Sequence, residues 1–365
     1  MRIVLDGTPL LGVRTGIGRY VAELLPRLVL AARSRLPAAR IGVSTWTWRG
    51  GTLADLPAGT RQVGRRAPAR LLQTVWSWLD HPVVEDLVGD IDIFHGTNFV
   101  SPPTRRAREV VTVHDLTYID LTETVSSASL AYQRLVPRAL ERGAHVLVPT
   151  EVVRDAVMET YGLPASRVTT TPLGVDRAWF SKQAPPREHG LTDLPSRYIV
   201  FVGSLDPRKN LPRLIEAHQQ AQAVDASVPD LVLAGPAGRE TSLQGSPGVH
   251  LTGWLSDAAL RSVVAGSQGL ALPSLDEGFG LPVVETLACG LPVLTSDLPV
   301  FSEVAGEFAV TCQPTEIDSI VQALVTLSQT ETVPGVAARR RAWASAFTWE
   351  RCAERTLDAY LRVVS

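Results

Sequence analysis

Lysine is almost missing from this chain of 365 residues, because only Lys182 and Lys209 stand among its 35 basic residues and the rest are arginine. A lysine inside a motif is therefore hard to explain as background composition. A basic excess is missing too: 37 acidic residues give a formal net charge of −2, which excludes a dedicated nucleic-acid-binding protein. The charge is uneven, with a net +4 on residues 1–175 and a net −6 on residues 176–365. An anionic partner or a membrane surface is better sought on the first part.

Cysteine and long apolar runs are scarce as well. Cys289, Cys312 and Cys352 form no closely spaced pair, which predicts a reducing compartment and excludes a cysteine-based metal site. No stretch approaches the roughly 18 consecutive apolar residues of a membrane-spanning helix. The opening Met1-Arg-Ile-Val-Leu-Asp6 reaches a carboxylate too soon for a secretory signal. We therefore expect a cytoplasmic protein, either free or at the inner face of a membrane.

Apolar, β-branched runs recur along the chain with helix-like patterns between them, at residues 3–5, 91–94, 110–113, 145–148, 198–202, 231–234, 269–272 and 292–294. Continuous rather than alternating hydrophobicity is typical of parallel strands covered on both faces. At roughly 150 residues per domain, the length allows two domains. We predict an α/β protein with two doubly wound, Rossmann-like domains at 1–180 and 196–345.

The boundary between the domains is expected between Gly174 and Ser196, where Pro185, Pro186, Gly190 and Pro195 break any periodicity. The final segment, 346–365, is predicted to be an amphipathic helix with Thr348 as its N-cap. Its expected packing partner is the first domain.

Chemistry is expected in the loops that follow strands, because ligands of open α/β sheets bind at the carboxyl ends of the strands. The first such loop is Thr15-Gly-Ile-Gly18-Arg-Tyr20. Its glycines would let backbone N–H groups approach a phosphate at a helix start. However, Val21 stands where a dinucleotide fingerprint has its third glycine. A phosphate cradle and a plain structural turn are equally compatible with this loop.

The second loop, 203–211, places Arg208 and Lys209 just before a helix. Cations are unfavourable there, because the N-terminal end of the helix dipole is positive. The pair is explained if a diphosphate lies between the two side chains, with arginine as a fork and lysine as a point charge. The alternative is a solvated surface pair.

The third loop, 273–285, is the most informative. Pro282 fits the first turn of a helix that begins near Leu281, so the free N–H groups of the helix start face the preceding glycines. Glu277 in the loop and Glu285, expected in the first helical turn, flank this anion site. Such a site suits a nucleotide sugar, which has hydroxyls at both ends and phosphates between them. Alternatively, Glu285 only complements the helix dipole and Glu277 is solvated.

These loops resemble those of the retaining glycosyltransferases of family four, which have the GT-B fold. The resemblance rests on Glu277-x7-Glu285 with Gly278-Phe-Gly280 and Pro282, on Gly203 and on Arg208-Lys209. Matches in the same order along the chain are Gly16-Ile-Gly18-Arg-Tyr20, His95-Gly-Thr-Asn98, Val113-His-Asp115, Pro149-Thr150, Pro172-Leu-Gly-Val-Asp176, Gly253-Trp254 and Trp349. The resemblance implies two Rossmann-like domains that face each other across a cleft. One departure is Ser204, where many relatives carry arginine, which leaves more of the charge to Arg208 and Lys209.

Carried over residue by residue, the resemblance implies that Arg208 and Lys209 bind the donor diphosphate, Glu285 accepts from the ribose hydroxyls and Glu277 holds the transferred sugar. The implied catalytic residues are His114, Glu277, Arg208 and Lys209. The implied donor-binding residues are Gly16, Gly18, Gly203, Ser204, Arg208, Lys209, Trp254, Glu277, Phe279, Gly280, Leu281 and Glu285. The implied acceptor-binding residues are Asn98, Asp115 and Tyr118. From the residues alone, His114 is also explained as a hydrogen-bonded core histidine and Trp254 as a core residue.

Two further patterns need interpretation. Asp90-Ile-Asp92 matches a DxD metal motif, but it lies at the amino end of a predicted strand and away from the expected chemistry, so we expect no metal and no cofactor. The segment 65–78 holds three arginines and two tryptophans. It forms either a basic, aromatic patch for a membrane surface or an acceptor, or a partly buried helix with a solvated rim.

The expected reaction is transfer of a hexose from a nucleoside-diphosphate sugar to a hydroxyl of a saccharide, glycolipid or small molecule. No carboxylate pair suited to double displacement is evident, so front-face substitution with retention is expected. The segments 16–20 and 95–98 resemble mannosyl- and rhamnosyltransferases of polysaccharide assembly, which favours GDP-mannose as donor. No nucleic-acid partner is expected. Two alternatives stay open: a UDP-N-acetylglucosamine 2-epimerase and a two-lobed solute-binding protein.

Overall fold

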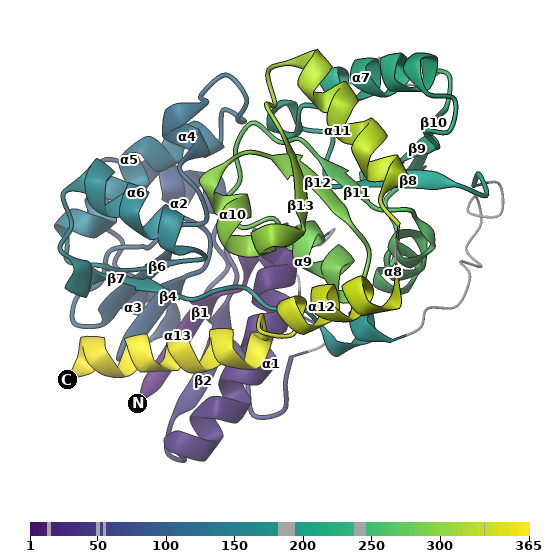
Figure 1. Cartoon of the computed structure of the whole chain (residues 1–365). Helices are drawn as coiled ribbons and strands as arrows, with labels where there is room; N and C mark the ends of the chain where they lie inside the picture. The colour runs from purple at the N-terminus through teal and green to yellow at the C-terminus, as the bar shows by residue number, and fades with distance from the viewer. Residues whose placement is uncertain (13–15, 49–51, 54–55, 182–193, 237–245, 332) are drawn as a thin grey trace. The chain divides into compact units, whose positions relative to one another are not determined.

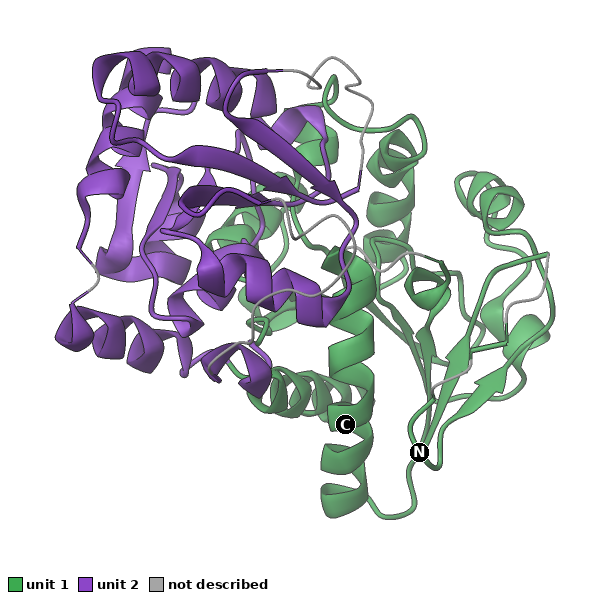
Figure 2. Cartoon of the chain, turned by 90° about the vertical axis from the view of Figure 1, so that its right-hand side faces the viewer, with its two compact units in different colours: residues 1–174, 348–365 green, residues 175–347 purple. Residues whose placement is uncertain are grey.

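The computed structural model describes residues 1–12, 16–48, 52–53, 56–181, 194–236, 246–331 and 333–365 (Figure 1). The chain divides into two compact units, shown in different colours in Figure 2. Unit 1 comprises residues 1–174 and 348–365, and unit 2 comprises residues 175–347. Residues 175–180 and 346–347 thus belong with unit 2, although the sequence assigns them to the first domain and to the final helix. Pro185, Pro186 and Gly190 of the predicted boundary lie outside the described residues.

Unit 1 is built on a seven-stranded sheet in the order β3-β2-β1-β4-β5-β6-β7, with every neighbouring pair parallel. The strands are β1 (Arg2–Asp6), β2 (Arg40–Ser44), β3 (Arg61–Val63), β4 (Ile93–Gly96), β5 (Arg108–Thr112), β6 (His145–Val148) and β7 (Val168–Thr170). The strand order reverses between β1 and β4. In doubly wound sheets, ligands bind at the carboxyl ends of the strands beside such a reversal.

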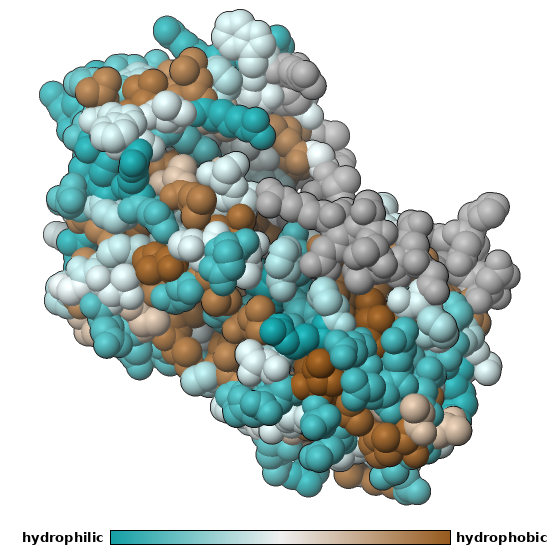
Figure 3. Space-filling view, turned by 90° about the horizontal axis from the view of Figure 1, so that it is seen from above, coloured by the Kyte–Doolittle hydropathy of each residue, from teal (hydrophilic) through white to brown (hydrophobic). Residues whose placement is uncertain are grey.

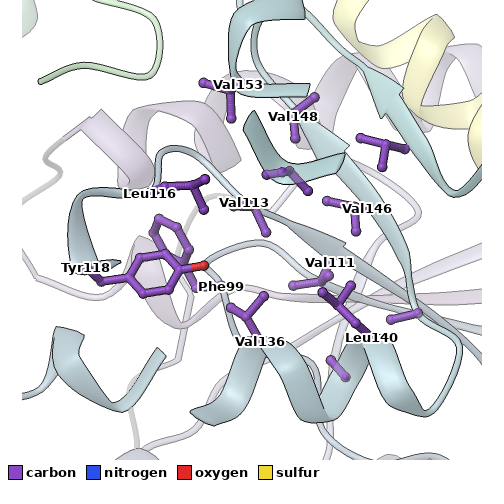
Figure 4. Close-up of a cluster of buried hydrophobic side chains, with 14 residues drawn as sticks. Phe99, Val111, Val113, Leu116, Tyr118, Val136, Leu140, Val146, Val148 and Val153 are labelled. Atoms are coloured by element: carbon purple, nitrogen blue, oxygen red, sulfur yellow. The ribbon is translucent and has the colours of Figure 1, made fainter. Parts of the chain in front are cut away.

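The helices of unit 1, apart from the C-terminal one, lie in the connections between successive parallel strands. They are α1 (Gly16–Arg35), α2 (Ala69–Trp76), α3 (Val84–Val88), α4 (Thr117–Asp120), α5 (Tyr132–Glu141), α6 (Glu151–Tyr161) and α13 (Trp349–Val364). Short 3₁₀ helices lie at Thr8–Leu10, Ser129–Ala131 and Ala165–Arg167. Part of the core lies between α5 and the strands β5 and β6, where Val111, Val146 and Val148 pack in one cluster with Val136 and Leu140 (Figure 4).

The C-terminal helix α13 belongs to unit 1 and packs against α1. Thr348 is its N-cap, as predicted, and its hydroxyl accepts a hydrogen bond from the Arg351 N–H at 3.1 Å. Inside the unit, the Tyr360 hydroxyl lies 2.6 Å from Nδ1 of His95 on β4. The last helix of the chain is therefore tied to a central strand of the first sheet.

Unit 2 is built on a six-stranded sheet in the order β10-β9-β8-β11-β12-β13, again with every pair parallel. The strands are β8 (Tyr198–Val202), β9 (Asp230–Ala234), β10 (Val249–Gly253), β11 (Leu270–Leu272), β12 (Val293–Ser296) and β13 (Ala309–Cys312). The helices are α7 (Leu211–Val224), α8 (Asp257–Gly266), α9 (Leu281–Ala288), α10 (Pro299–Ala305), α11 (Ile317–Gln329) and α12 (Pro334–Ala344), with 3₁₀ helices at Arg177–Phe180, Pro207–Lys209 and Gly306–Phe308. Here the strand order reverses between β8 and β11.

The surface shows no large separation of polar and apolar residues in the view of Figure 3, where hydrophobic residues are scattered among hydrophilic ones. Within the described ranges, no helix combines the length and the hydropathy needed to cross a membrane.

Candidate active site

Two loops of unit 2 meet at the carboxyl ends of the neighbouring strands β8 and β11. The first loop leads from β8 to α7, and the second leads from β11 to α9. The N–H of Leu275 in the second loop donates to the carbonyl of Arg208 in the first at 2.8 Å. The Asn210 amide adds a further link, because it donates to the carbonyls of Pro273 at 3.0 Å and Pro314 at 2.6 Å. The two predicted loops therefore form one structural unit.

Asn210 is a site residue that the sequence analysis does not identify. It is 2% exposed and adopts a φ of +62°, a left-handed conformation that asparagine tolerates better than most residues. The available signal was an asparagine directly before the helix start at Leu211. That position suggests an N-cap, yet the side chain makes no cap hydrogen bond and bridges the loops instead.

Arg208, Lys209 and Glu277 form an ionic cluster between these loops, in which Lys209 and Glu277 are buried and Arg208 is partly exposed. The Glu277 carboxylate accepts from the Lys209 ammonium, from the Arg208 guanidinium at 3.1 Å and from the Ser274 hydroxyl at 3.0 Å. Lys209 and Glu277 are each 8% exposed. Burial of either charge alone would be strongly unfavourable, so each side chain depends on its partner.

The charges in this cluster shift each other's protonation. Burial raises the pKa of Glu277, but the positive charges of Lys209 and Arg208 outweigh burial and hold this pKa at about 2. Burial lowers the pKa of Lys209, and the Glu277 carboxylate opposes that shift. The sequence analysis assigned the cations to a diphosphate and Glu277 to a sugar. The structure brings all three together, so Glu277 also orients both cations.

The start of α9 lies where the sequence predicts it, at Leu281, with Pro282 in the first turn. Gly280 precedes it with a φ of +84°, and a Cβ at this position would approach the Phe301 ring to 2.8 Å. Glycine is therefore required by both the backbone conformation and the available space. The first turn holds no acidic residue, so the positive end of this helix dipole is not complemented by the helix itself.

Glu285 lies deeper in α9 than predicted. It is the fifth residue of the helix rather than part of its first turn, because the helix begins at Leu281. Its side chain is only 2% exposed, which argues against a simple role as a solvated complement to the dipole. Phe279 is also buried, with its ring 5.7 Å from that of Phe347, so only its backbone N–H suits an anion site.

Gly203 and Ser204 follow the end of β8. A Cβ on Gly235 would come within 1.8 Å of the Gly203 carbonyl oxygen, so the two glycine backbones lie in close contact. The Ser204 hydroxyl donates to the Asp206 carboxylate within its own loop. Trp254 follows β10 and is 55% exposed, which removes the alternative of a core tryptophan.

His114 lies at the carboxyl end of β5 in unit 1 and is 9% exposed. Its Nε2 is 2.9 Å from the carbonyl oxygen of Thr97. Because a carbonyl only accepts, Nε2 carries the proton, and the neutral ring presents Nδ1 as an acceptor. Burial lowers the pKa of His114, although the bond to Thr97 opposes the shift. The rings of Tyr20 and Phe99 contact the imidazole edge to face, with centroids 5.1 and 5.5 Å away.

The predicted acceptor residues have different environments. Asn98 follows β4, and its Oδ1 is buried with no hydrogen-bond partner among the described residues. Asp115 Oδ1 accepts from the backbone N–H of the first residue of α4 at 3.2 Å. Tyr118 is 1% exposed and its hydroxyl lies 2.7 Å from that of Tyr161. This tyrosine packs in the core (Figure 4), and we do not carry it into the proposed site.

The glycines of the first predicted loop are helical in the structure. The helix α1 begins at Gly16, so Gly16 and Gly18 lie in its first turn, whereas Thr15 lies outside the described residues. A Cβ on Gly16 would meet no atom within 4 Å, whereas Gly18 is buried. Only Gly16 therefore has open space around it.

Asp6 is a buried carboxylate that the sequence analysis does not assign to the site. It ends β1 at the strand-order reversal and is 6% exposed. Its Oδ1 accepts from the Thr8 N–H at 2.8 Å and from the Thr8 hydroxyl at 2.5 Å. Burial raises the pKa of Asp6 to about 6, against the opposing effect of these bonds. The available signal was a carboxylate directly after a buried parallel strand.

The DxD pattern lies at the opposite edge of the sheet. Asp92 immediately precedes β4 and accepts from the N–H of Arg2 at 2.6 Å, at the amino ends of the strands. In the part of the chain that the structure describes, no group of three or more His, Cys, Asp or Glu side chains is arranged to hold a metal ion. The three cysteines are unbridged.

Comparison with known proteins identifies the family. Residues 15–179 match the family described as Glycosyltransferase Family 4, and residues 196–330 match the one described as Glycosyl transferases group 1. The chain belongs to the family 4 glycosyltransferases. This glycosyltransferase is similar to O-antigen chain mannosyltransferase B of Escherichia coli, with 26% identity and 99% of each chain covered.

A second relative is a GDP-mannose-dependent alpha-(1-6)-phosphatidylinositol dimannoside mannosyltransferase of Mycobacterium tuberculosis. It is 34% identical over 52% of this chain and 51% of the relative. Among solved structures, sucrose-phosphate synthase from Thermosynechococcus elongatus has a TM-score of 0.72 at 18% identity, covering 99% of this chain and 98% of that one. The lipopolysaccharide glycosyltransferase WaaG has a TM-score of 0.66 at 17% identity, covering 99% and 96%. At these identities the structural likeness establishes the fold, which is GT-B with two Rossmann-like domains.

Proposed function

We propose that this glycosyltransferase transfers mannose from GDP-mannose to a hydroxyl group of a saccharide or lipid-linked saccharide, with retention at the anomeric carbon. The observation that carries the proposal is the ionic cluster of Arg208, Lys209 and Glu277 in the loops that precede α7 and α9. With all three groups ionised, the cluster has one net positive charge, and the start of α9 adds the positive end of a helix dipole. The similarity to two mannosyltransferases supports mannose as the transferred sugar, and one of them, the Mycobacterium tuberculosis relative, is GDP-mannose-dependent, which supports GDP.

Stabilisation of the leaving group is the main task of unit 2 in this proposal. As the bond from the anomeric carbon to the diphosphate breaks, negative charge grows on the diphosphate oxygens. Arg208 and Lys209 bind these oxygens, and Glu277 keeps both cations in place before the donor arrives. Preorganised charges of this kind are effective because they need little reorganisation during the reaction.

The hydroxyl groups at the two ends of the donor are assigned to hydrogen-bond-accepting side chains of the protein, which are two carboxylates and one neutral imidazole. Glu285 accepts from the ribose hydroxyls, and Glu277 accepts from a hydroxyl of the transferred sugar. Neutral His114 accepts from a further sugar hydroxyl through Nδ1, because Nε2 is committed to Thr97. Trp254, which is exposed in the loop after β10, is assigned to packing against the nucleotide base.

Front-face substitution follows from the use of the carboxylates. A double displacement needs one carboxylate free to attack the anomeric carbon. Glu277 instead accepts from two cations and a serine hydroxyl, which makes it a poor nucleophile. In the proposed step, the acceptor oxygen forms its bond on the face that the diphosphate leaves. The departing diphosphate oxygen then takes the acceptor proton.

A panel of nucleotide sugars tests this proposal. Incubation with GDP-mannose and a mannose-terminated acceptor is expected to release GDP and to give an α-linked product, identified by the anomeric proton in NMR. If UDP is released from a UDP-sugar instead, the donor is that UDP-sugar and the assignment of GDP-mannose is wrong. A change confined to the sugar would indicate an epimerase, and binding without turnover of any donor would indicate a solute-binding protein. Loss of the α configuration would refute retention.

The proposal requires no metal ion, because Arg208, Lys209 and the start of α9 supply the positive charge. Turnover is therefore expected to survive excess EDTA. Loss of turnover in EDTA, with recovery on adding magnesium or manganese, would contradict this part of the proposal.

A further inference from the structure

The segment 65–78 borders a pocket in unit 1. Its two tryptophans differ: Trp76 is 1% exposed and donates through Nε1 to the Pro82 carbonyl at 2.9 Å, whereas Trp78 is 63% exposed. A pocket of about 540 Å³ lies beside Trp78, between α2, the 3₁₀ helix Ser129–Ala131 and the start of α5. One tryptophan of the segment therefore belongs to the core and the other to a concave surface.

The pocket is cationic. Arg70 from α2 and Arg134 from α5 line it, and none of the described residues that line it is acidic. The Arg134 guanidinium lies 4.6 Å from the centroid of the Trp78 ring. Among the described residues, no carboxylate pairs with Arg70 or Arg134, whereas Arg138, one turn further along α5, binds Asp80 at 2.6 Å. The two pocket arginines are therefore available to an anionic ligand.

We propose that this pocket binds an anionic sugar residue, one that carries a carboxylate or a phosphate group, within the acceptor chain. The exposed face of Trp78 suits stacking against the apolar side of a pyranose ring. Arg70 and Arg134 suit a carboxylate or phosphate, which a guanidinium binds with two parallel hydrogen bonds. The side-chain amides of Gln73 and Gln133, which also line the pocket, match sugar hydroxyls. The inference rests on the proposed function in that it takes a saccharide as the acceptor.

The wall of this pocket is also joined to the expected acceptor region. Gln133 donates through its amide to the Tyr118 carbonyl at 2.8 Å. The neighbouring Tyr132 stacks on Phe99 with ring centroids 4.6 Å apart, and Phe99 directly follows Asn98 in the chain. Asn98 follows β4 at the carboxyl edge of the sheet. The segment that lines the pocket therefore continues to that edge, which favours an acceptor chain over an unrelated ligand.

A lipid surface is the other candidate, because Leu71 and Leu79 are 59% and 60% exposed near the pocket. A flat surface of lipid headgroups does not fill a concave pocket, whereas a single sugar residue does. We therefore favour the sugar and keep the membrane as an outcome of the experiment.

Ligand binding to the full chain tests the inference. Glucuronate and mannose 6-phosphate are titrated by saturation-transfer NMR, with mannose and inorganic phosphate as probes of the ring alone and the anion alone. The acidic sugars are expected to bind at least about tenfold more tightly than either partial probe, and Trp78→Leu and Arg134→Gln are each expected to weaken them at least about tenfold. Matched controls are Trp48→Leu, at a tryptophan that is 71% exposed, and Arg106→Gln, at an exposed arginine outside the lining. Both controls are expected to bind as the wild type does.

Three results would overturn the inference: no binding of either acidic sugar, equal binding of inorganic phosphate, or binding that Trp78→Leu leaves unchanged. If the protein instead co-sediments with phosphatidylglycerol vesicles in a way that depends on Trp78, and binds no acidic sugar, the pocket region binds a membrane surface and the proposal of a sugar ligand is wrong. Titration of the wild type with GDP separates the two proposals. Absence of GDP binding would contradict the proposed function, whereas GDP binding without acidic-sugar binding would contradict only the pocket.

Discussion

The carboxyl edges of the two sheets hold opposite kinds of polar groups. In unit 2, Lys209 and Glu277 are buried as ions and Arg208 is partly buried, and each has a partner of opposite charge. In unit 1, burial shifts the pKa of His114 and of Asp6 toward the neutral form, and for His114 this effect outweighs the opposing charge of Asp115. Unit 2 is therefore suited to charge that develops on a diphosphate. Unit 1 is suited to the neutral hydroxyls of sugars.

The largest expected effect comes from removing a cation of unit 2. Lys209→Ala is expected to lower turnover by about 10²–10³, because the leaving diphosphate loses a preorganised positive charge. Steady-state kinetics with the preferred donor measures this loss. Lys209 is buried against Glu277, so the single variant also leaves a poorly compensated carboxylate.

The double variant Lys209→Ala/Glu277→Gln separates the two effects. It removes the uncompensated charge, so its melting temperature is expected to recover while its turnover stays low. Recovery of turnover together with stability would mean that Lys209 has a structural role only.

The second prediction concerns the two glutamates of unit 2. Glu277→Gln removes the negative charge that orients Arg208 and Lys209 and that accepts from a hydroxyl of the transferred sugar. The value of kcat is therefore expected to fall by about 10². Binding of free GDP is expected to weaken less than kcat falls, because both cations remain in the chain and the product lacks the sugar. Glu285→Gln is expected to weaken the binding of GDP about tenfold, because one charged hydrogen bond to the ribose is lost. Calorimetry with GDP compares the two, and equal weakening would refute the division of roles.

The sequence predicts the central strands of both sheets better than the outer ones. β1, β4, β5, β6, β8, β9, β11 and β12 are buried between neighbours, and their continuous apolar runs predict them. The unpredicted strands β3, β7, β10 and β13 are the edges of the sheets. An edge strand has one neighbour and accepts polar residues, so its hydrophobic signal is weak. The other unpredicted strand, β2, has Gly42 at its centre, which interrupts the apolar run.

The site loops are predictable from motifs, but their contacts are not. The spacing of Arg208, Lys209 and Glu277 places them in loops, while the pairing of Lys209 with Glu277 joins positions 68 residues apart. No local pattern specifies such a contact. Asn210 is missed for a related reason, because its bonds to Pro273 and Pro314 depend on the packing of distant segments.

The third prediction tests the neutral character of unit 1. His114→Ala is expected to lower turnover about tenfold, because one hydrogen bond to the sugar is lost, and to leave the binding of GDP unchanged. Because the pKa of His114 is lowered in the folded protein, its neutral form contributes stability above the ordinary value of 6.5, and that contribution is lost as the pH falls below it. Turnover of the wild type and turnover of His114→Ala are therefore expected to depend on pH in the same way near pH 6.5. An inflection there that only the wild type shows would mean that His114 acts as an ion, as the groups of unit 2 do.

The last prediction, with the smallest expected effect on turnover, concerns Asp6 and is measured as stability. Its pKa is raised from 3.8 to about 6, so the folded protein binds this proton more tightly than the unfolded chain does. The resulting stability is fully present below pH 3.8 and is lost as the pH rises through about 6, at a cost of up to about 3 kcal/mol. Asp6→Asn cannot ionise, and its Oδ1 can still accept both bonds from Thr8. The melting temperature of the wild type is therefore expected to fall relative to that of Asp6→Asn between about pH 4 and pH 6, and the difference is expected to stay constant from there to pH 8. A variant that melts lower than the wild type at pH 8 would show that the ionised carboxylate is stabilised, and the contrast between the two sheet edges would then fail at this residue.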